Sequence, residues 1–137
     1  AAVAVAPRLR PFEARIVVDD RPLYAGPVWQ VVLPNTRRWG GVLSMAPNAS
    51  ADDGLLDVVA LRDRGRLHLL VDLVELLVRR RPHPADVAAG RGLVIRIETD
   101  GPVALELDGT PLTAQADGPF LFEVEPAALQ ILAPRIG

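Results

Sequence analysis

Apolar and polar residues alternate with a period of two along most of the chain. In "GLVIRIET", residues 92–99, three apolar positions alternate with Arg96 and Glu98. Similar short runs follow in "VALELD", "PFLFEVE" and "LQILAP". Such alternation is typical of half-buried antiparallel strands, so the C-terminal part of the chain is predicted to be mainly β.

The N-terminal part of the chain predicts further strands. Two β-branched apolar runs between Glu13 and Leu33 are joined by "DDRPLYAG", which predicts a hairpin. After the loop "PNTRRWGG", the sequence predicts a short strand in "VLSMAP" and a stronger one in "LLDVVALR". Two Asp-Gly pairs, Asp100-Gly101 and Asp108-Gly109, predict tight turns between the later strands.

The period changes to three and four residues after Gly65, which predicts one amphipathic helix that faces a core. Arginines and then proline in "RRRPHP" predict its C-terminus. We therefore expect a single domain over residues 1–137, an antiparallel β-sandwich with one covering helix. The apolar positions of the helix are Leu67, Leu70, Val71, Val74, Leu77 and Val78.

Composition excludes several kinds of chemistry. All 15 basic residues are arginine, so a Walker-type phosphate loop and Schiff-base catalysis, which both need lysine, are excluded. The chain has no cysteine, which excludes disulfides and thiolate metal sites and fits a cytoplasmic protein. The acidic balance, a net charge of −2, and six aromatic residues disfavour nucleic-acid binding.

The acidic stretch "SADDGLLD" is the first candidate site. Asp52 and Asp53 precede Gly54, and Asp57 follows two residues after Leu55. Carboxylates beside backbone carbonyls form the oxygen-only sites that Mg²⁺ and Ca²⁺ prefer. The alternative from spacing alone is a turn stabilised by an aspartate side chain at the entrance to a strand.

Asp108 is the second candidate. A carboxylate there could accept a hydroxyl proton if it lay within hydrogen-bond distance in a water-poor site. The alternative is a two-residue type I′ turn, for which Asp-Gly between alternating strands is a common signal.

The other polar and aromatic candidates carry weaker signals. His68 and His83 lack the spacing of a metal site or a catalytic triad and are expected to be solvated. Residues Arg79 to Arg81 could contact anionic lipid head groups or form an exposed helix end. Trp29 and Trp39 are interpreted as packing residues.

Taken in order, these segments resemble the C-terminal half of the diacylglycerol kinase catalytic family, which includes bacterial lipid kinases and sphingosine kinases. The resemblance covers almost the whole chain. It is carried by "VVLPNTRRWGGVLSMAPNASADDGLLDVVAL", "VIRIETDGPVALELDGTPL" and "FEVEPAALQILAP". In that family, a nucleotide-binding domain with a Gly-Gly-Asp-Gly-Thr signature precedes a β-sandwich. That signature does not occur here, so the resemblance implies that ATP is bound mainly by a domain absent from this chain.

The resemblance also implies two sites. A structural Mg²⁺ would be held by Asp53 with the backbone carbonyls of Ser50 and Leu55. The family's Asp-Gly-Glu signature corresponds to Asp108, Gly109 and Thr110, so the first acid matches and the second does not. Threonine cannot act as a base at neutral pH. If the family's second acid is the true base, this protein has lost it. The hypothesis adopted here is that Asp108 orients and deprotonates a lipid hydroxyl for attack on the γ-phosphate of ATP.

The expected partners are a lipid substrate and the chain's own N-terminal nucleotide-binding domain. Peripheral contact at the inner membrane face and formation of a homodimer are left open. Isolated from that domain, the chain is expected to be inactive. Two alternatives remain: a non-catalytic module that binds lipid or protein, and a structural platform that dimerises through a strand edge.

Overall fold

The computed structural model describes residues 3–6, 10–37, 44–79, 83–116, 119–125 and 128. These residues form nine strands, one α-helix and one short 3₁₀ helix, η1. The elements are β1 (Val3–Ala6), β2 (Phe12–Val18), β3 (Arg21–Leu33), β4 (Leu56–Arg62), α1 (Arg66–Arg79), η1 (Pro84–Asp86), β5 (Val87–Gly92), β6 (Val94–Thr99), β7 (Val103–Leu107), β8 (Thr110–Ala116) and β9 (Phe120–Glu123).

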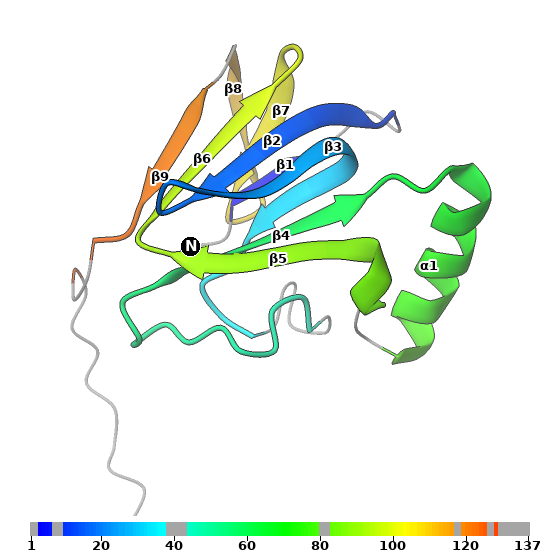
Figure 1. Ribbon diagram of the computed structural model, residues 1–137, viewed down its shortest axis with the longest axis horizontal. Helices are drawn as coiled ribbons and strands as arrows, with labels where there is room; N and C mark the ends of the chain where they lie inside the picture. The colour runs from blue at the N-terminus through cyan, green and yellow to red at the C-terminus, as the bar shows by residue number, and fades with distance from the viewer. Residues whose placement is uncertain are drawn as a thin grey trace, which may run out of the picture.

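The long strand β3 organises the sheet. Its first half pairs with β2, while its second half pairs with β1 on one side and β4 on the other. The pairing with β4 is irregular between Val28 and Gln30, where β3 passes from one set of neighbours to the other. The strands therefore form two layers that share β3: β2, β6 and β9 continue one layer, and β4, β5, β1, β7 and β8 the other (Figure 1).

The main core lies between these two layers. Ile16 from β2 and Ile95 and Ile97 from β6 pack with Val58 and Ala60 from β4, and all five are buried. A second, smaller core covers the outer face of β3 and β4, where Val32 and Val59 pack against Met45, Ala46 and Ala49. Because β4 is covered on both faces, its residues 58–61 form a continuous apolar run, not an alternating one.

Close packing explains why the strand β5, "VAAGRG", has a glycine at residue 92. A Cβ atom at Gly92 would lie 2.4 Å from a carboxylate oxygen of Asp19 and 2.6 Å from a methyl group of Val18. That carboxylate accepts the backbone N–H groups of Leu93 and Val94, each at 2.9 Å, so it cannot move aside without losing them. Glycine is therefore needed where β5 passes the β2–β3 turn.

The mainly antiparallel β-sandwich expected from the sequence is confirmed. The expected hairpin is also present, but its turn is tighter than predicted, because it is formed by Asp19 and Asp20, both with positive φ, and β3 begins at Arg21. Strands β1, β5 and β8 were not predicted. The described part of "VLSMAP", residues 44–47, is not a strand, and "LQILAP" lies outside the described residues.

Helix α1 has the predicted start and end, but its expected packing on the core is wrong. Its six predicted core residues, from Leu67 to Val78, are between 57% and 80% exposed. Figure 1 shows α1 beside the ends of β4 and β5, not over a face of either layer. Periodicity identified an apolar face without identifying what covers it. Within the described residues, no helix is long and apolar enough to cross a bilayer.

Candidate functional site

The two acidic turns lie at the same end of one layer. Across that layer, Leu107 of β7 pairs with Val3 of β1, and Val3 pairs with Leu33 of β3. On the other side of β3, Val32 pairs with Val59 of β4. The turn after Leu107 and the loop before Leu56 therefore emerge in the same direction. Three strand spacings separate them, or about 14 Å, which is too far for both to bind one ion directly.

The β7–β8 turn has type I′ geometry, as the Asp-Gly pair predicts. Asp108 has φ of +50° and Gly109 has φ of +81°. Leu107 pairs directly with Thr110, so the turn contains only these two residues. Asp108 and Thr110 are both exposed in this domain. The turn thus places a carboxylate at the end of the sheet. The type I′ turn that was the alternative for Asp108-Gly109 is confirmed, and it is compatible with a chemical role for the carboxylate.

The acidic loop is closed by local hydrogen bonds. The backbone N–H of Leu55 donates to Asp53 Oδ1 at 2.9 Å, and Gly54 between them has φ of +70°. The Ser50 hydroxyl donates to a carboxylate oxygen of Asp52, and this bond lowers the pKa of Asp52. These contacts show the aspartate-stabilised turn that spacing alone predicted.

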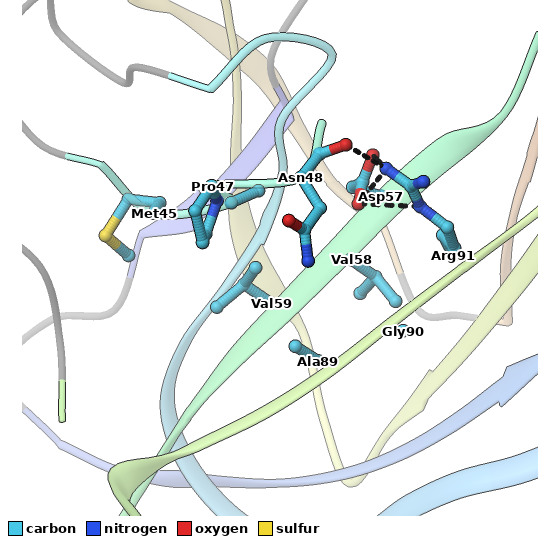
Figure 2. Close-up of a pocket in the computed structure, with 10 residues that line it drawn as sticks. Met45, Pro47, Asn48, Asp57, Val58, Val59, Ala89, Gly90 and Arg91 are labelled. Carbon is cyan, nitrogen blue, oxygen red and sulfur yellow. Dashed lines mark hydrogen bonds and ion pairs between the residues drawn. The ribbon is translucent and has the colours of Figure 1, made fainter. Parts of the chain in front are cut away.

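Arg91 joins the acidic loop to β5 (Figure 2). It is the direct cross-strand neighbour of Asp57, and its guanidinium donates to both carboxylate oxygens of Asp57, at 3.3 and 3.2 Å. The same guanidinium donates to the backbone carbonyl of Asn48 and lies 3.5 Å from Asp53 Oδ2. One side chain therefore holds together the loop before residue 50, the turn at Asp53 and the start of β4.

Burial raises the pKa of Asp57 above its usual value, although the charge of Arg91 and its hydrogen bonds act in the opposite direction. The Asp57 side chain is only 10% exposed. The loss of hydration therefore outweighs the stabilisation of its charge by Arg91, whose hydrogen bonds to it are 3.2 and 3.3 Å long. Arg91 therefore offsets part of the cost of burying the Asp57 carboxylate.

A shallow pocket of about 300 Å³ lies beside this ion pair. Figure 2 shows Asn48 and Pro47 from the loop on one side and Val58, Val59, Ala89 and Gly90 from β4 and β5 on the other. Its walls are largely apolar, and its two charged side chains, Asp57 and Arg91, already bind each other. This arrangement suits packing more than recognition of a charged ligand.

The donor groups of the acidic loop are compatible with a hard cation. Asp53 and the carbonyls of Ser50 and Leu55 lie within six consecutive residues and supply only oxygen. Asp53 is shared, however, because Oδ1 accepts a backbone N–H and Oδ2 faces Arg91. No cluster of three metal-ligating side chains occurs among the described residues. A cation here would therefore rely on one carboxylate, backbone carbonyls and water.

The remaining candidates fall outside these two turns. His68 is exposed, and His83 Nδ1 accepts the backbone N–H of Ala85 at the start of η1. Trp29 is buried, as expected of a packing residue, whereas Trp39 lies outside the described residues. Sequence reasoning missed Arg91 and Asn48. An arginine between two glycines gave no signal of its own, because its partner Asp57 is 34 positions away in the chain.

Residues 1–133 match the family of YegS C-terminal NAD kinase beta sandwich-like domains. The chain belongs to this family. Membership in the YegS C-terminal family confirms the resemblance to the C-terminal half of diacylglycerol kinases and agrees with the two-layered fold.

Curated relatives agree with this assignment. The chain is 32% identical over 133 residues to "Diacylglycerol kinase" of Mycobacterium tuberculosis strain H37Rv, a match that covers 95% of this chain and 41% of the relative. It is 29% identical over 127 residues to "Probable lipid kinase YegS-like" of Shewanella frigidimarina, covering 91% of this chain and 39% of the relative. The chain thus spans about two fifths of the length of these relatives.

Solved structures share the fold. A putative diacylglycerol kinase from Bacillus anthracis superposes with a TM-score of 0.67 at 22% identity, covering 85% of this chain and 37% of that one. A second structure, of a diacylglycerol kinase from the same organism, has a TM-score of 0.63 at 19% identity, covering 93% of this chain and 50% of that one. At this identity the likeness establishes the architecture alone.

Proposed function

We propose that this domain is the lipid-side half of an ATP-dependent lipid kinase, in which Asp108 accepts the proton of the lipid hydroxyl. The observation that supports this most directly is membership in the YegS C-terminal family, whose relatives above are named as diacylglycerol and lipid kinases. The exposed position of Asp108 at the end of the sheet is consistent with the role, because the carboxylate can be approached from outside the domain.

The proposed reaction moves one phosphoryl group and one proton. The lipid hydroxyl oxygen forms a bond to the γ-phosphorus of ATP, the bond from that phosphorus to the β–γ bridging oxygen breaks, and ADP leaves. The hydroxyl proton passes to the Asp108 carboxylate. A general base contributes about 10²- to 10⁴-fold, and positioning of the two reactants supplies much of the rest.

Two parts of this proposal lie beyond the chain. Asp108 is exposed here, so a water-poor site around it requires cover from a second domain, which we propose to be an N-terminal nucleotide-binding domain. Mg²⁺ bound with ATP would neutralise charge on the phosphates. We further propose that Asp53, with the carbonyls of Ser50 and Leu55, holds a structural cation that stiffens the acidic loop.

A second candidate function rests on Thr110. Where the kinase family's motif has its second acid, this chain has an exposed threonine, which has no basic group. A domain that had lost catalysis could still bind lipid or a partner protein through the same end of the sheet. We rank this second because Asp108 is retained and can act as a base without a neighbouring acid.

Transfer of labelled phosphate from ATP to diacylglycerol in detergent micelles tests the proposal. The natural protein that carries this chain is expected to produce phosphorylated lipid. The isolated domain is expected to produce none, because one domain does not position both reactants. Failure of the natural protein with diacylglycerol, phosphatidylglycerol and a sphingoid base would instead favour the binding module.

A further inference from the structure

One nitrogen atom of Arg91 faces more oxygen atoms than it can bind. Its Nη2 donates to the backbone carbonyl of Asn48 and to both carboxylate oxygens of Asp57, and it lies 3.5 Å from Asp53 Oδ2. Figure 2 shows the contacts with Asn48 and Asp57. This nitrogen carries two hydrogens, so it cannot donate to four acceptors at full strength. Among the described residues, no other cationic side chain forms an ion pair with Asp53 or Asp57. Arg91 therefore balances the charge of both carboxylates.

The contact of Arg91 with Asp53 is weaker than its contact with Asp57. The Asp57 side chain is only 10% exposed, so little water is available to replace its hydrogen bonds to Arg91. The Asp53 contact is an ion pair without a hydrogen bond, and the Asp53 side chain is 25% exposed. The other carboxylate oxygen of Asp53 accepts the N–H of Leu55. Arg91 can therefore lose Asp53 and keep its remaining partners.

The shape of the acidic loop does not depend on the contact between Arg91 and Asp53. Before residue 50, the loop is anchored by Met45, Ala46 and Ala49, which are buried in the second core. The N–H of Ala49 also donates to the carbonyl of Ala46 at 3.0 Å. After residue 50, the hydrogen bond from Leu55 to Asp53 fixes the turn. The oxygen atoms of the proposed cation site, in residues 50–55, thus lie in a segment that is held on both sides without Arg91.

A cation bound at Asp53 and the guanidinium of Arg91 would repel each other. Both are attracted by the same carboxylate, and a divalent cation carries twice the charge of the guanidinium. Water and salt screen this repulsion at a partly exposed position but do not abolish it. Removal of the guanidinium would therefore raise the affinity of the acidic loop for a cation.

We propose that Arg91 is an internal counter-cation of the acidic loop, which releases Asp53 when a divalent cation binds and keeps Asp57 and the carbonyl of Asn48. This inference rests on the structural cation in the proposed function. It makes Arg91 a positioning residue that competes with the cation, and not one that prepares the site for it. The acidic loop then remains folded both with and without the cation.

Binding of Mn²⁺ to the natural protein without nucleotide tests this inference. The electron paramagnetic resonance signal of free Mn²⁺ measures the bound fraction, and the binding lost on Asp53→Asn, in each background, identifies the ion at the acidic loop. Arg91→Met should bind this ion about three- to tenfold more tightly, because the guanidinium no longer repels it. Weaker binding by Arg91→Met would overturn the inference.

Arg64→Met is the matched control for the Mn²⁺ titration. Arg64 also pairs with an aspartate, Asp86, at 2.6 Å, but it lies beyond the opposite end of β4 from the acidic loop. Its replacement should leave the affinity for Mn²⁺ unchanged. Tighter binding by both arginine variants would also overturn the inference, because the effect would then not come from the contact with Asp53.

Thermal unfolding gives a second readout. Without the cation, Arg91→Met and Arg64→Met should both melt below wild type, since each leaves a buried aspartate without its arginine. A ligand stabilises most the variant that binds it most tightly. Mn²⁺ should therefore reduce the difference between Arg91→Met and wild type, while the difference between Arg64→Met and wild type stays the same. An equal response of both variants would mean that Arg91 is a structural residue alone.

Asp57→Asn tests the different roles given to the two carboxylates. It should weaken binding of Mn²⁺ about threefold or more, because Arg91 loses the carboxylate that holds it and can pair more closely with Asp53. In the Arg91→Met background, the same substitution should have a much smaller effect. Equal weakening in both backgrounds would mean that Asp57 binds the ion directly, which would contradict the inference.

The Mn²⁺ measurements use neither ATP nor lipid, so they separate this inference from the proposed kinase reaction. If the natural protein phosphorylates lipid but Asp53→Asn loses no Mn²⁺ binding in either background, the inference fails and the kinase function stands. If Arg91→Met binds Mn²⁺ more tightly while the natural protein phosphorylates no lipid, the inference stands and the kinase function fails.

Discussion

Two acidic turns share one end of the sheet, and they are built differently. The loop around Asp53 and Asp57 is held by Arg91 and by hydrogen bonds within the loop. The turn at Asp108 has the backbone geometry of an Asp-Gly pair, and Asp108 is exposed. The two Asp-Gly turns therefore have different roles in the domain. Carboxylates bound by a guanidinium stabilise the fold, whereas an exposed carboxylate on a rigid hairpin can take part in chemistry.

The largest expected effect concerns the exposed turn. In the natural protein, Asp108→Asn should lower the rate of lipid phosphorylation about 10²- to 10⁴-fold, because asparagine cannot accept the proton. Stability should hardly change, since asparagine also tolerates positive φ. The matched control is Asp100→Asn in the other Asp-Gly turn, at the opposite end of β7, which should leave the rate unchanged. Comparable rates for Asp108→Asn and wild type would contradict the assignment.

The second effect concerns the bound carboxylates. Arg91→Met should reduce the free energy of unfolding by about 1–3 kcal/mol, because it leaves the buried Asp57 carboxylate and the Asn48 carbonyl without their partner. Urea unfolding of the isolated domain measures this change. Arg96→Met on the exposed face of β6 is the control and should stay within about 0.5 kcal/mol of wild type. Equal stability of both variants would mean that the Arg91 contacts contribute little.

A smaller effect is expected at Asp53. Asp53→Asn keeps an acceptor for the Leu55 N–H, so the unfolding free energy should fall by less than about 1 kcal/mol. Binding of Mg²⁺ or Mn²⁺, measured by calorimetry, should nevertheless weaken, because the loop loses its anionic ligand. Asp52→Asn is the control, since Asp52 binds Ser50 and is not a proposed ligand. If both variants bind the cation as wild type does, Asp53 does not hold a metal.

The smallest effect is expected at Thr110. If Asp108 is the base, Thr110→Glu should change the rate of lipid phosphorylation by less than about tenfold, because the added acid is not needed for proton transfer. A gain of about a hundredfold or more would show that the missing acid limits this protein. Thr110→Gln, of similar size and without charge, separates an effect of the carboxylate from an effect of bulk.

Local patterns predicted much of the sheet, because alternation and Asp-Gly turns depend on neighbouring residues. Strands β6, β7 and β9 and the type I′ turn at Asp108 were found in this way. Strand β5 was missed, because its glycines are required by contacts with Val18 and Asp19, which are distant in the sequence. The role of Arg91 was missed for the same reason. The helix was located correctly, but its apolar face could not reveal whether it meets a core or another molecule.

The most direct test of the central claim is a crystal structure of the natural protein with a lipid alcohol and a non-hydrolysable ATP analogue bound. The account predicts that the lipid hydroxyl lies within about 2.6–3.2 Å of an Asp108 carboxylate oxygen and points toward the γ-phosphate. A lipid hydroxyl bound elsewhere, with Asp108 still facing solvent, would contradict it.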